Sequence, residues 1–172
     1  MRRGVWALVA VAALLTACGG GVEGSAVAGE RWDPCSITPE IIEAAGLDPA
    51  YRDEGWGEAL SVAGWARCEY MPPGAHAPYA LSVMSSNDHT VAEARTRSAN
   101  KEGRDLEVGG RTAYLYKTEF GAAIRDCNMA LEVPPGVAVF TVLYQEDDGV
   151  DACGVLQEHM RNLVAAVPSG SK

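Results

Sequence analysis

The cysteines constrain this chain more than any other feature of its sequence. There are five of them, Cys18, Cys35, Cys68, Cys127 and Cys153, and Cys18 differs from the rest because it directly follows an apolar run. In an exported protein the remaining even set predicts disulfides, with three possible connectivities. None of the four lies in a Cys-x-x-Cys spacing, so a zinc site or a thioredoxin-type pair has little support. We therefore expect two structural disulfides and no metal site.

Local periodicity favours one of the three connectivities. Alternate residues from Cys127 to Val133 are apolar, which is typical of a strand with Cys127 pointing inward. Apolar residues then recur at helical spacing from Cys153 onward, so Cys153 lies on the buried face of a last helix. Because both sulfurs point into one core, we predict a Cys127–Cys153 disulfide and, by elimination, Cys35–Cys68. The chain-entropy model gives each about 3–4 kcal/mol.

The N-terminus predicts export and attachment to a membrane. A positive start, Met1 to Arg3, precedes an uncharged apolar run from Gly4 to Ala17 that is shorter than the roughly 20 residues of a spanning helix. The run ends Leu-Thr-Ala-Cys, which resembles the lipobox of bacterial lipoproteins. That resemblance implies that Cys18 carries acyl chains and becomes the new N-terminus. Two or more chains give stable anchoring.

Composition divides the chain into four parts. We expect a lipoprotein signal peptide over 1–17, a lipidated tether over 18–30, one domain over 31–168 and a tail over 169–172. The tether is glycine-rich, and a random coil of that length reaches about 20 Å.

Removing Arg2 and Arg3 leaves 12 basic against 23 acidic residues, a net charge of −11. Such a domain is repelled by anionic lipid and by nucleic acid, and we expect no nucleic-acid partner.

The domain is predicted to be α+β, with a twisted, mainly antiparallel sheet and an N-terminal, a middle and a C-terminal helix. The first helix follows Thr38 and ends at Gly46, and the middle helix opens with a Thr90–Glu93 capping box, ends near Gly103 and lies on the surface. The predicted strands are Ala66–Met71, Tyr79–Ser85, Asp105–Val108, Arg111–Thr118, Ala122–Val133 and Val137–Tyr144. The two-residue loop Gly109-Gly110 suits a hairpin between the strands on either side of it.

Four short patterns are similar to those of a group of actinobacterial secreted lipoproteins built on a domain of unknown function. They are Asp33-Pro34-Cys35, Cys68-Glu69-Tyr70, Gly110 to Ala113 and Asp151-Ala152-Cys153, after a lipobox and a glycine-rich tether. Tyr70 stands where that group more often has tryptophan, and the fold expectation is unaffected. The resemblance implies envelope anchoring and a small disulfide-bonded domain, and it brings no catalytic residues.

Two hypotheses about chemistry, a calcium-binding loop and a Ser/His/Asp hydrolase, have weak support in the sequence. The acidic run 146–151 lacks the alternating ligands and the closing Glu of a calcium loop, and capping of the last helix explains it better. Ser85, Ser86, Asp88 and His89 lie close in sequence, but a triad is assembled in space, and there is no Gly-x-Ser-x-Gly elbow. His159 is expected on the polar side of the last helix. We predict no catalytic residues and no cofactor.

Aromatic residues give the one candidate binding surface. Trp32, Trp56, Trp65 and Tyr51 either pack beside the Cys35–Cys68 disulfide or present a contact surface. The candidate surface comprises Trp56, Trp65 and His76, which lies in the "PPGAHAP" loop.

The expected function is that of an envelope lipoprotein on the extracytoplasmic face of the cell membrane. Its non-catalytic domain would bind an envelope protein, a lipid or a small molecule, and it would contact the membrane through acylated Cys18. The alternative is a hydrolase acting on envelope material.

Overall fold

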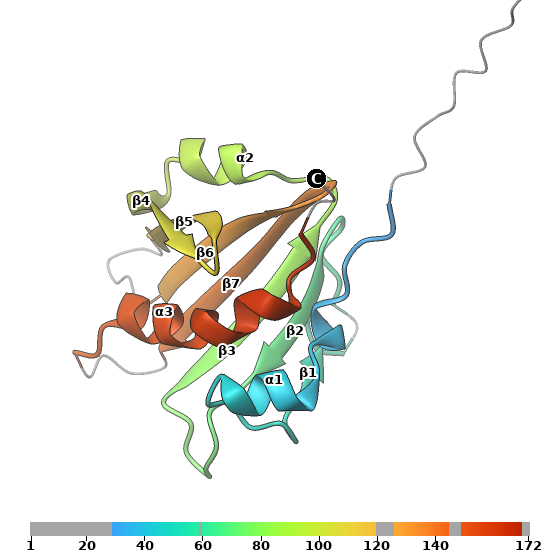
Figure 1. Ribbon diagram of the computed structural model, residues 1–172, viewed down its shortest axis with the longest axis vertical. Helices are drawn as coiled ribbons and strands as arrows, with labels where there is room; N and C mark the ends of the chain where they lie inside the picture. The colour runs from blue at the N-terminus through green and yellow to red at the C-terminus, as the bar shows by residue number, and fades with distance from the viewer. Residues whose placement is uncertain (1–28, 59, 120–125, 145–148, 170–172) are drawn as a thin grey trace, which may run out of the picture.

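The fold is one antiparallel sheet with helices on both faces (Figure 1). The computed structural model describes residues 29–58, 60–119, 126–144 and 149–169. In these residues seven strands are hydrogen-bonded in the order β1-β2-β3-β7-β6-β5-β4, and all six pairings are antiparallel. The strands are β1 (Asp53–Glu54), β2 (Ala66–Tyr70), β3 (Tyr79–Ser86), β4 (Asn100–Val108), β5 (Arg111–Thr118), β6 (Asp126–Val133) and β7 (Gly136–Tyr144).

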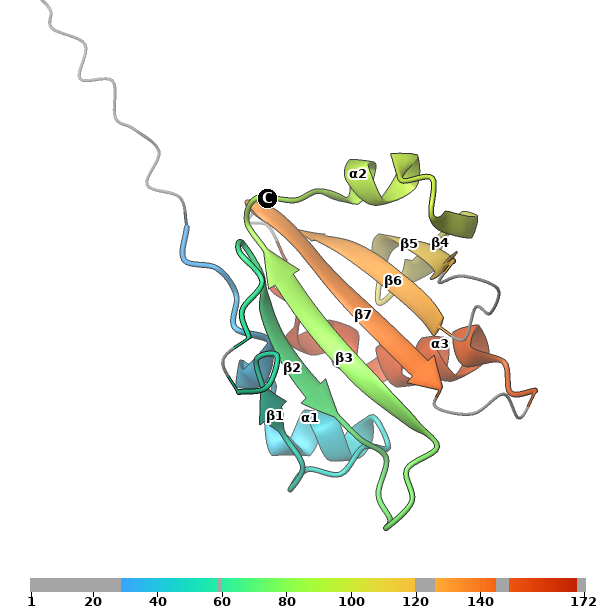
Figure 2. The same ribbon diagram turned by 180° about the vertical axis from the view of Figure 1, so that it is seen from behind.

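The helices divide unequally between the two faces of the sheet. One face carries α1 (Pro39–Ala44) and α3 (Ala152–Leu163), with 3-10 turns η1 (Pro34–Ser36) and η2 (Val164–Ala166) beside them. On the opposite face the short α2 (Val91–Thr96) is the only helix of the described residues, and it packs near β4 and β6. Figure 2 shows that β2, β3 and β7 lie open on this second face. The first is called the covered face below, and the second the open face.

Strand alternation places two apolar clusters on the two faces. Leu81, Val83 and Phe140 are fully buried in the larger cluster, which α1 and α3 cover. Their neighbours point the other way, and Val137 and Val139 of β7 join a smaller cluster under Val91 of α2. Because successive side chains of a strand point to opposite faces, the same strands supply both clusters.

Both predicted disulfides are confirmed. Cys35 joins η1 to β2 through Cys68, and the Cα atoms of this pair lie 5.2 Å apart. Cys127 joins β6 to α3 through Cys153, with Cα atoms 5.1 Å apart. The alternation of β6 and the helical period of α3 therefore gave the correct pairing, because each pattern fixes the face on which its cysteine lies.

Glycine occupies positions where the backbone has a positive φ or where two strands approach too closely for a side chain. Gly109 and Gly110 both have positive φ, 56° and 74°, and they form the predicted hairpin between β4 and β5. At Gly136, where β7 begins, a Cβ atom would lie 1.9 Å from the carbonyl oxygen of Ser86. Close approach of β3 and β7 at this end therefore requires glycine.

The mainly antiparallel sheet and the three helices are as predicted, but several boundaries are wrong. The middle helix does not continue to Gly103: α2 ends at Thr96, because Arg97 is extended with ψ 122°. The next residues pair with β5, so β4 begins at Asn100 rather than at Asp105. The two-residue β1 was not predicted. The first part of the predicted strand over 122–133 lies outside the described residues.

His159 was predicted on the polar side of the last helix, and this is wrong. It is buried, with 5 % of its surface exposed, and it lies between α1 and β3. The Tyr79 hydroxyl donates to its Nε2 at 2.7 Å, and its Nδ1 donates to the Ala45 carbonyl at 2.7 Å. Helical spacing could not reveal this, because the partners belong to other elements.

The start of α3 follows ordinary capping chemistry. Asp151 caps α3, its side chain accepting from the Cys153 backbone N–H at 3.1 Å, which confirms capping for this part of the acidic run. Residues 146–148 of that run lie outside the described residues. None of the helices in the described segments is long and apolar enough to cross a membrane.

Candidate ligand-binding groove

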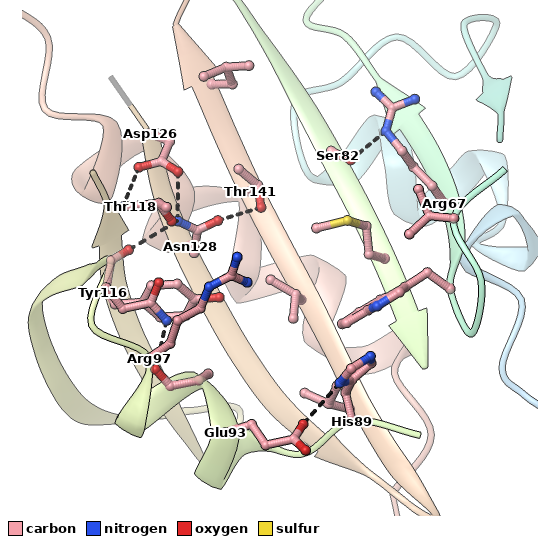
Figure 3. A pocket seen from close by; sticks show the side chains of 18 of the residues that line it. Arg67, Ser82, His89, Glu93, Arg97, Tyr116, Thr118, Asp126, Asn128 and Thr141 are labelled. Atoms are coloured by element: carbon pink, nitrogen blue, oxygen red, sulfur yellow. Dashed lines mark hydrogen bonds and ion pairs between the residues drawn. The ribbon is translucent and has the colours of Figure 1, made fainter. Parts of the chain in front are cut away.

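The open face of the sheet forms a groove of about 660 Å³ (Figure 3). Its floor is made by alternate residues of β2, β3, β7, β6 and β5, and residues of α2 and of the segment before β2 form its walls. Pockets of roughly 300–1,000 Å³ that are mostly apolar and carry a few polar groups are typical of small-molecule sites. The groove has the size and the lining of such a site.

Aromatic rings form one wall of the groove. Trp65 stacks on His89, with ring centroids 4.9 Å apart and planes 18° apart. The Arg67 guanidinium lies over the Trp56 ring, 5.4 Å from its centroid. The Trp56 Nε1 atom is buried and has no hydrogen-bond partner among the described residues. Buried indole N–H groups ordinarily have an acceptor, so this atom is available to one.

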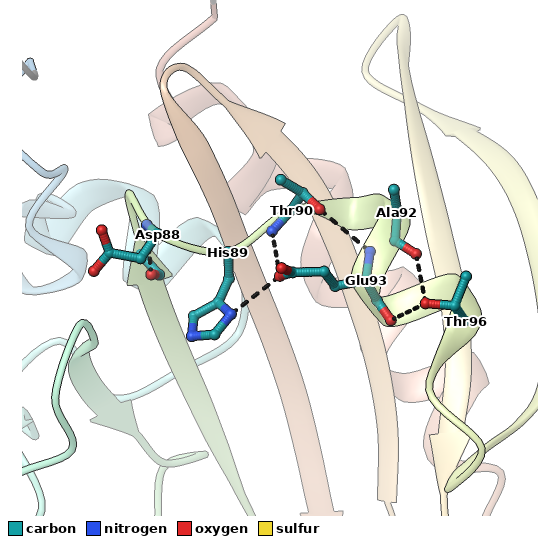
Figure 4. Close-up of polar contacts among 7 residues, drawn as sticks. Asp88, His89, Thr90, Ala92, Glu93 and Thr96 are labelled. Carbon is teal, nitrogen blue, oxygen red and sulfur yellow. Dashed lines mark hydrogen bonds and ion pairs between the residues drawn. The ribbon is translucent and has the colours of Figure 1, made fainter.

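The start of α2 fixes His89 at the rim (Figure 4). Thr90 and Glu93 form the predicted capping box: the Glu93 carboxylate accepts from the Thr90 backbone N–H at 3.0 Å, and Thr90 Oγ1 accepts from the Glu93 N–H at 3.2 Å. The same carboxylate is 3.0 Å from His89 Nδ1. The backbone hydrogen bond from Thr90, and then the contact with His89, hold the pKa of Glu93 below its usual value.

A polar network lies on the floor at the start of β6. Asp126 and Asn128 are 3 % and 5 % exposed. The Asp126 carboxylate accepts from the Thr118 backbone N–H at 2.7 Å and from the Asn128 amide at 2.9 Å, and Asn128 Oδ1 accepts from the Thr141 hydroxyl at 2.7 Å. These polar side chains therefore satisfy one another and hold strands β5, β6 and β7 in register.

Every charged side chain of the groove except Arg97 has an ion-pair or hydrogen-bond partner among the described residues. Arg67 is bonded to Glu69, and His89 contacts Glu93. Arg97 lines the groove and forms no ion pair or side-chain hydrogen bond with any described residue. Figure 3 shows its guanidinium over the groove floor.

Tyr116 lies near the charged groups of the groove. Burial, and secondarily the nearby Asp126 carboxylate, raise the pKa of Tyr116 to about 12, and Arg97 opposes this shift. Tyr116 is therefore a neutral phenol at physiological pH.

Exposed apolar side chains concentrate at the groove. The exposed large hydrophobic residues of the described chain are Leu60, Val62, Leu143 and Val150. Val62 and Leu143 line the groove, and Leu60 belongs to the same segment as Val62. Exposed apolar surface that is contiguous with a groove marks an interaction site more often than scattered single residues do.

The structure brings together two of the three residues of the predicted binding surface. Trp56 and Trp65 are half-buried, and both line the groove. His76 is exposed in its loop and does not line it. Trp32 instead packs against the large core, and its ring centroid is 6.4 Å from that of Phe140. The aromatic residues thus divide between core packing and the groove.

Ser85 and His89, two residues of the hydrolase hypothesis, lie on opposite faces of the sheet. Ser85 is buried on the covered face, and its hydroxyl donates to the Trp32 carbonyl at 2.6 Å. His89 lies at the rim of the groove on the open face. Ser86 Oγ accepts from the Asp88 backbone N–H at 3.1 Å, which is a local turn contact.

No group of three or more His, Cys, Asp or Glu side chains in the described segments could hold a metal ion.

Three groove residues were missed in the sequence: Arg97, Asp126 and Asn128. A signal for the last two existed, because Asp126 and Asn128 alternate with the inward-pointing Cys127 and therefore share the other face of β6. Arg97 gave no signal, because it was placed inside a helix that in fact ends before it.

Fold and groove together define a small disulfide-bonded α+β domain with a concave site of ligand size on its sheet. A family described as proteins of unknown function, DUF3558, matches residues 13–166, and the chain belongs to that family. Searches of curated proteins and of solved structures found no significant match.

Proposed function

We propose that this protein is a lipid-anchored envelope protein of the actinobacterial lipoprotein type, whose domain holds a small amphipathic ligand in the groove without chemical turnover. Residues 1–17 serve as signal peptide, 18–30 as lipidated tether and 31–168 as the domain, which is displayed on the extracytoplasmic face of the membrane. The observation that carries the binding role is the groove of about 660 Å³ with Trp56 and Trp65 in its wall.

The two faces of the sheet differ in how completely helices cover them, and this difference supports the proposal. The covered face is packed under α1 and α3, whereas the open face leaves Met84 partly exposed and Leu143 exposed along a groove. Leaving apolar side chains in contact with water costs roughly 25 cal/mol per Å² relative to burying them. A ligand with apolar atoms recovers that free energy when it covers these side chains.

A photoreactive ligand tests binding at this place. The full chain in a non-ionic detergent is irradiated with a diazirine-bearing hexadecanol, and labelled peptides are identified by mass spectrometry. We expect labels on peptides of β3 and β7. Ala80→Phe, which fills the floor of the groove, should reduce labelling about tenfold, because it occupies the space of the chain.

Ala92→Phe is the matched control, because Ala92 is exposed on α2 and does not line the groove. It should label like the parent chain. Labelling spread evenly over the chain, or unchanged in Ala80→Phe, contradicts the proposal. Hydrolysis of an ester by the parent chain that disappears in His89→Ala would support the hydrolase alternative.

A further inference from the structure

We infer that the ligand is an anionic single-chain amphiphile drawn from the anchoring membrane, with its headgroup on Arg97 and its chain over the apolar floor of the groove. This inference rests on the proposed function and adds the charge class of the ligand, its source and the residue that selects it.

Charge pairing in the groove singles out Arg97. Arg67 is bonded to Glu69, and His89 contacts Glu93, so neither basic group is free. Arg97 is exposed and has no ion-pair partner among the described residues. A guanidinium offers five N–H donors in a planar fork that fits a carboxylate or phosphate. It is therefore the groove cation that can accept a new anion.

A cationic headgroup has no comparable partner. Three carboxylates line the groove. Glu69 is bonded to Arg67, and Glu93 accepts from the Thr90 backbone N–H and contacts His89. Asp126 is 3 % exposed, and both of its oxygens already accept hydrogen bonds from Thr118 and Asn128. A ligand cation would have to displace these donors, leaving buried polar groups without partners at a cost of about 1–3 kcal/mol each.

The net negative charge of the mature chain does not prevent an anionic headgroup from binding to Arg97 at contact distance. The negative charge is spread over the whole chain, and at physiological salt exposed charges are screened beyond about 8 Å. An anion bonded directly to Arg97 lies well within that distance. Local pairing, and not the total charge, therefore decides which headgroup binds.

Apolar side chains share the groove with Arg97. Met84 and Leu143 come from the adjacent strands β3 and β7; Met84 is partly exposed and Leu143 is exposed, and Val62 adds exposed apolar surface at the wall. A ligand with only an anionic group would leave this surface wet. An attached hydrocarbon chain covers it, at about 0.8 kcal/mol per buried CH₂.

The tether leaves the domain at the tryptophan end of the groove. Asn87, which directly follows β3, donates its amide to the Gly29 carbonyl at 2.8 Å. Trp65 directly precedes β2 at the same end, because Ala66 is paired with Ser85. A chain anchored through Cys18 therefore places this end of the groove within tether reach of the membrane, about 20 Å.

Three probes with the same photoreactive chain and different headgroups test the inference: a carboxylate, an alcohol and an ammonium. The full chain in a non-ionic detergent is compared with Arg97→Gln and with the control Arg104→Gln, an exposed arginine of β4 outside the groove lining. The parent chain should label groove peptides about tenfold more with the carboxylate than with the alcohol. Arg97→Gln should remove this preference and leave labelling by the alcohol unchanged, whereas Arg104→Gln should keep the preference.

Each other outcome has a definite meaning. Groove labelling that is equal for carboxylate and alcohol overturns the inference but keeps the proposed function, and absence of groove labelling by any probe overturns both. Preference for the ammonium probe assigns the headgroup to a carboxylate of the groove and overturns the inference. Displacement of the carboxylate probe by millimolar inorganic phosphate overturns the membrane source, because the anion would then bind without a chain.

Discussion

Tyr79 and His159 form a buried polar contact that joins three elements on the covered face. Tyr79 of β3 donates to His159 of α3, and His159 donates to the carbonyl of Ala45 at the end of α1. The two hydrogen bonds fix the neutral tautomer with the proton on Nδ1. Burial raises the pKa of Tyr79 to about 12, so its hydroxyl keeps its proton and remains the donor.

Acid should weaken the fold through His159. Burial lowers the pKa of His159 below its usual 6.5, and the hydrogen bond to Ala45 only partly opposes this. The unfolded chain therefore binds more protons below pH 6.5, so stability is complete above that pH and is lost as the pH falls toward the folded-state pKa. We expect the free energy of unfolding in urea to be lower at pH 5.0 than at pH 7.5, with a slope of at most about 1.4 kcal/mol per pH unit from this residue.

His159→Gln removes the titrating group, so its unfolding free energy should change less between the two pH values. His76→Gln is the control, because it makes the same substitution at a histidine that is exposed in a loop. Identical pH dependence in the parent and His159→Gln would contradict the assignment.

Among the elements, α2 owes its position to capping and packing more than to length. Six residues are too few for an isolated helix. The Thr90–Glu93 capping box satisfies backbone N–H groups at its start, and buried Val91 packs on Tyr114 and Val139. Because α2 forms a wall of the groove and is followed by Arg97, its position matters for the site as well as for the fold.

Thr90→Ala should reduce stability by about 1 kcal/mol, because the Glu93 backbone N–H loses its acceptor. Since the capping box also holds Glu93 and His89, labelling of the groove should fall as well. Thr96→Ala at the other end of the helix removes only exposed contacts to backbone carbonyls and is the control. The measurements are urea unfolding and the alcohol-probe labelling, and equal losses in the two variants would contradict this role of the cap.

At the scale of the whole molecule, both disulfides belong to the covered face. Cys35–Cys68 ties η1 to β2, and Cys127–Cys153 ties α3 to β6. Neither crosses the open face, where α2 is held by packing and side-chain contacts. The covalent links therefore stiffen the layer that supports the sheet, and they leave the groove face free to admit a ligand.

Attachment of this molecule to a membrane should depend on one atom, the Cys18 sulfur. Cys18→Ala removes the thiol that would carry the acyl chains, so processing at this site should stop and the mature mass with acyl chains should disappear. Mass spectrometry of the mature chain and membrane fractionation measure this. A parent chain without acyl mass, together with a variant that still fractionates with membranes, would show that the anchor is elsewhere.

Sequence periodicity predicted the structure correctly where the helix or strand that contains a residue decides the environment of its side chain. The alternation around Cys127 and the helical spacing after Cys153 gave the disulfide pairing, and the Gly109–Gly110 turn gave a hairpin. The helix after Thr90 was located correctly at its start, where the cap is a local contact. Its end was wrong because strand pairing with β5, a contact distant in sequence, takes over the following residues.

By itself, the sequence determined the α+β class, the disulfide connectivity and most strands, because these follow from which face each side chain must take. Only the tertiary structure decided that α2 covers just part of the open face, that Trp56 and Trp65 share a groove with Arg97, and that His76 stays outside it. These relations depend on how strands register and how helices pack across the sheet, and residues that meet in this way carry no common local pattern.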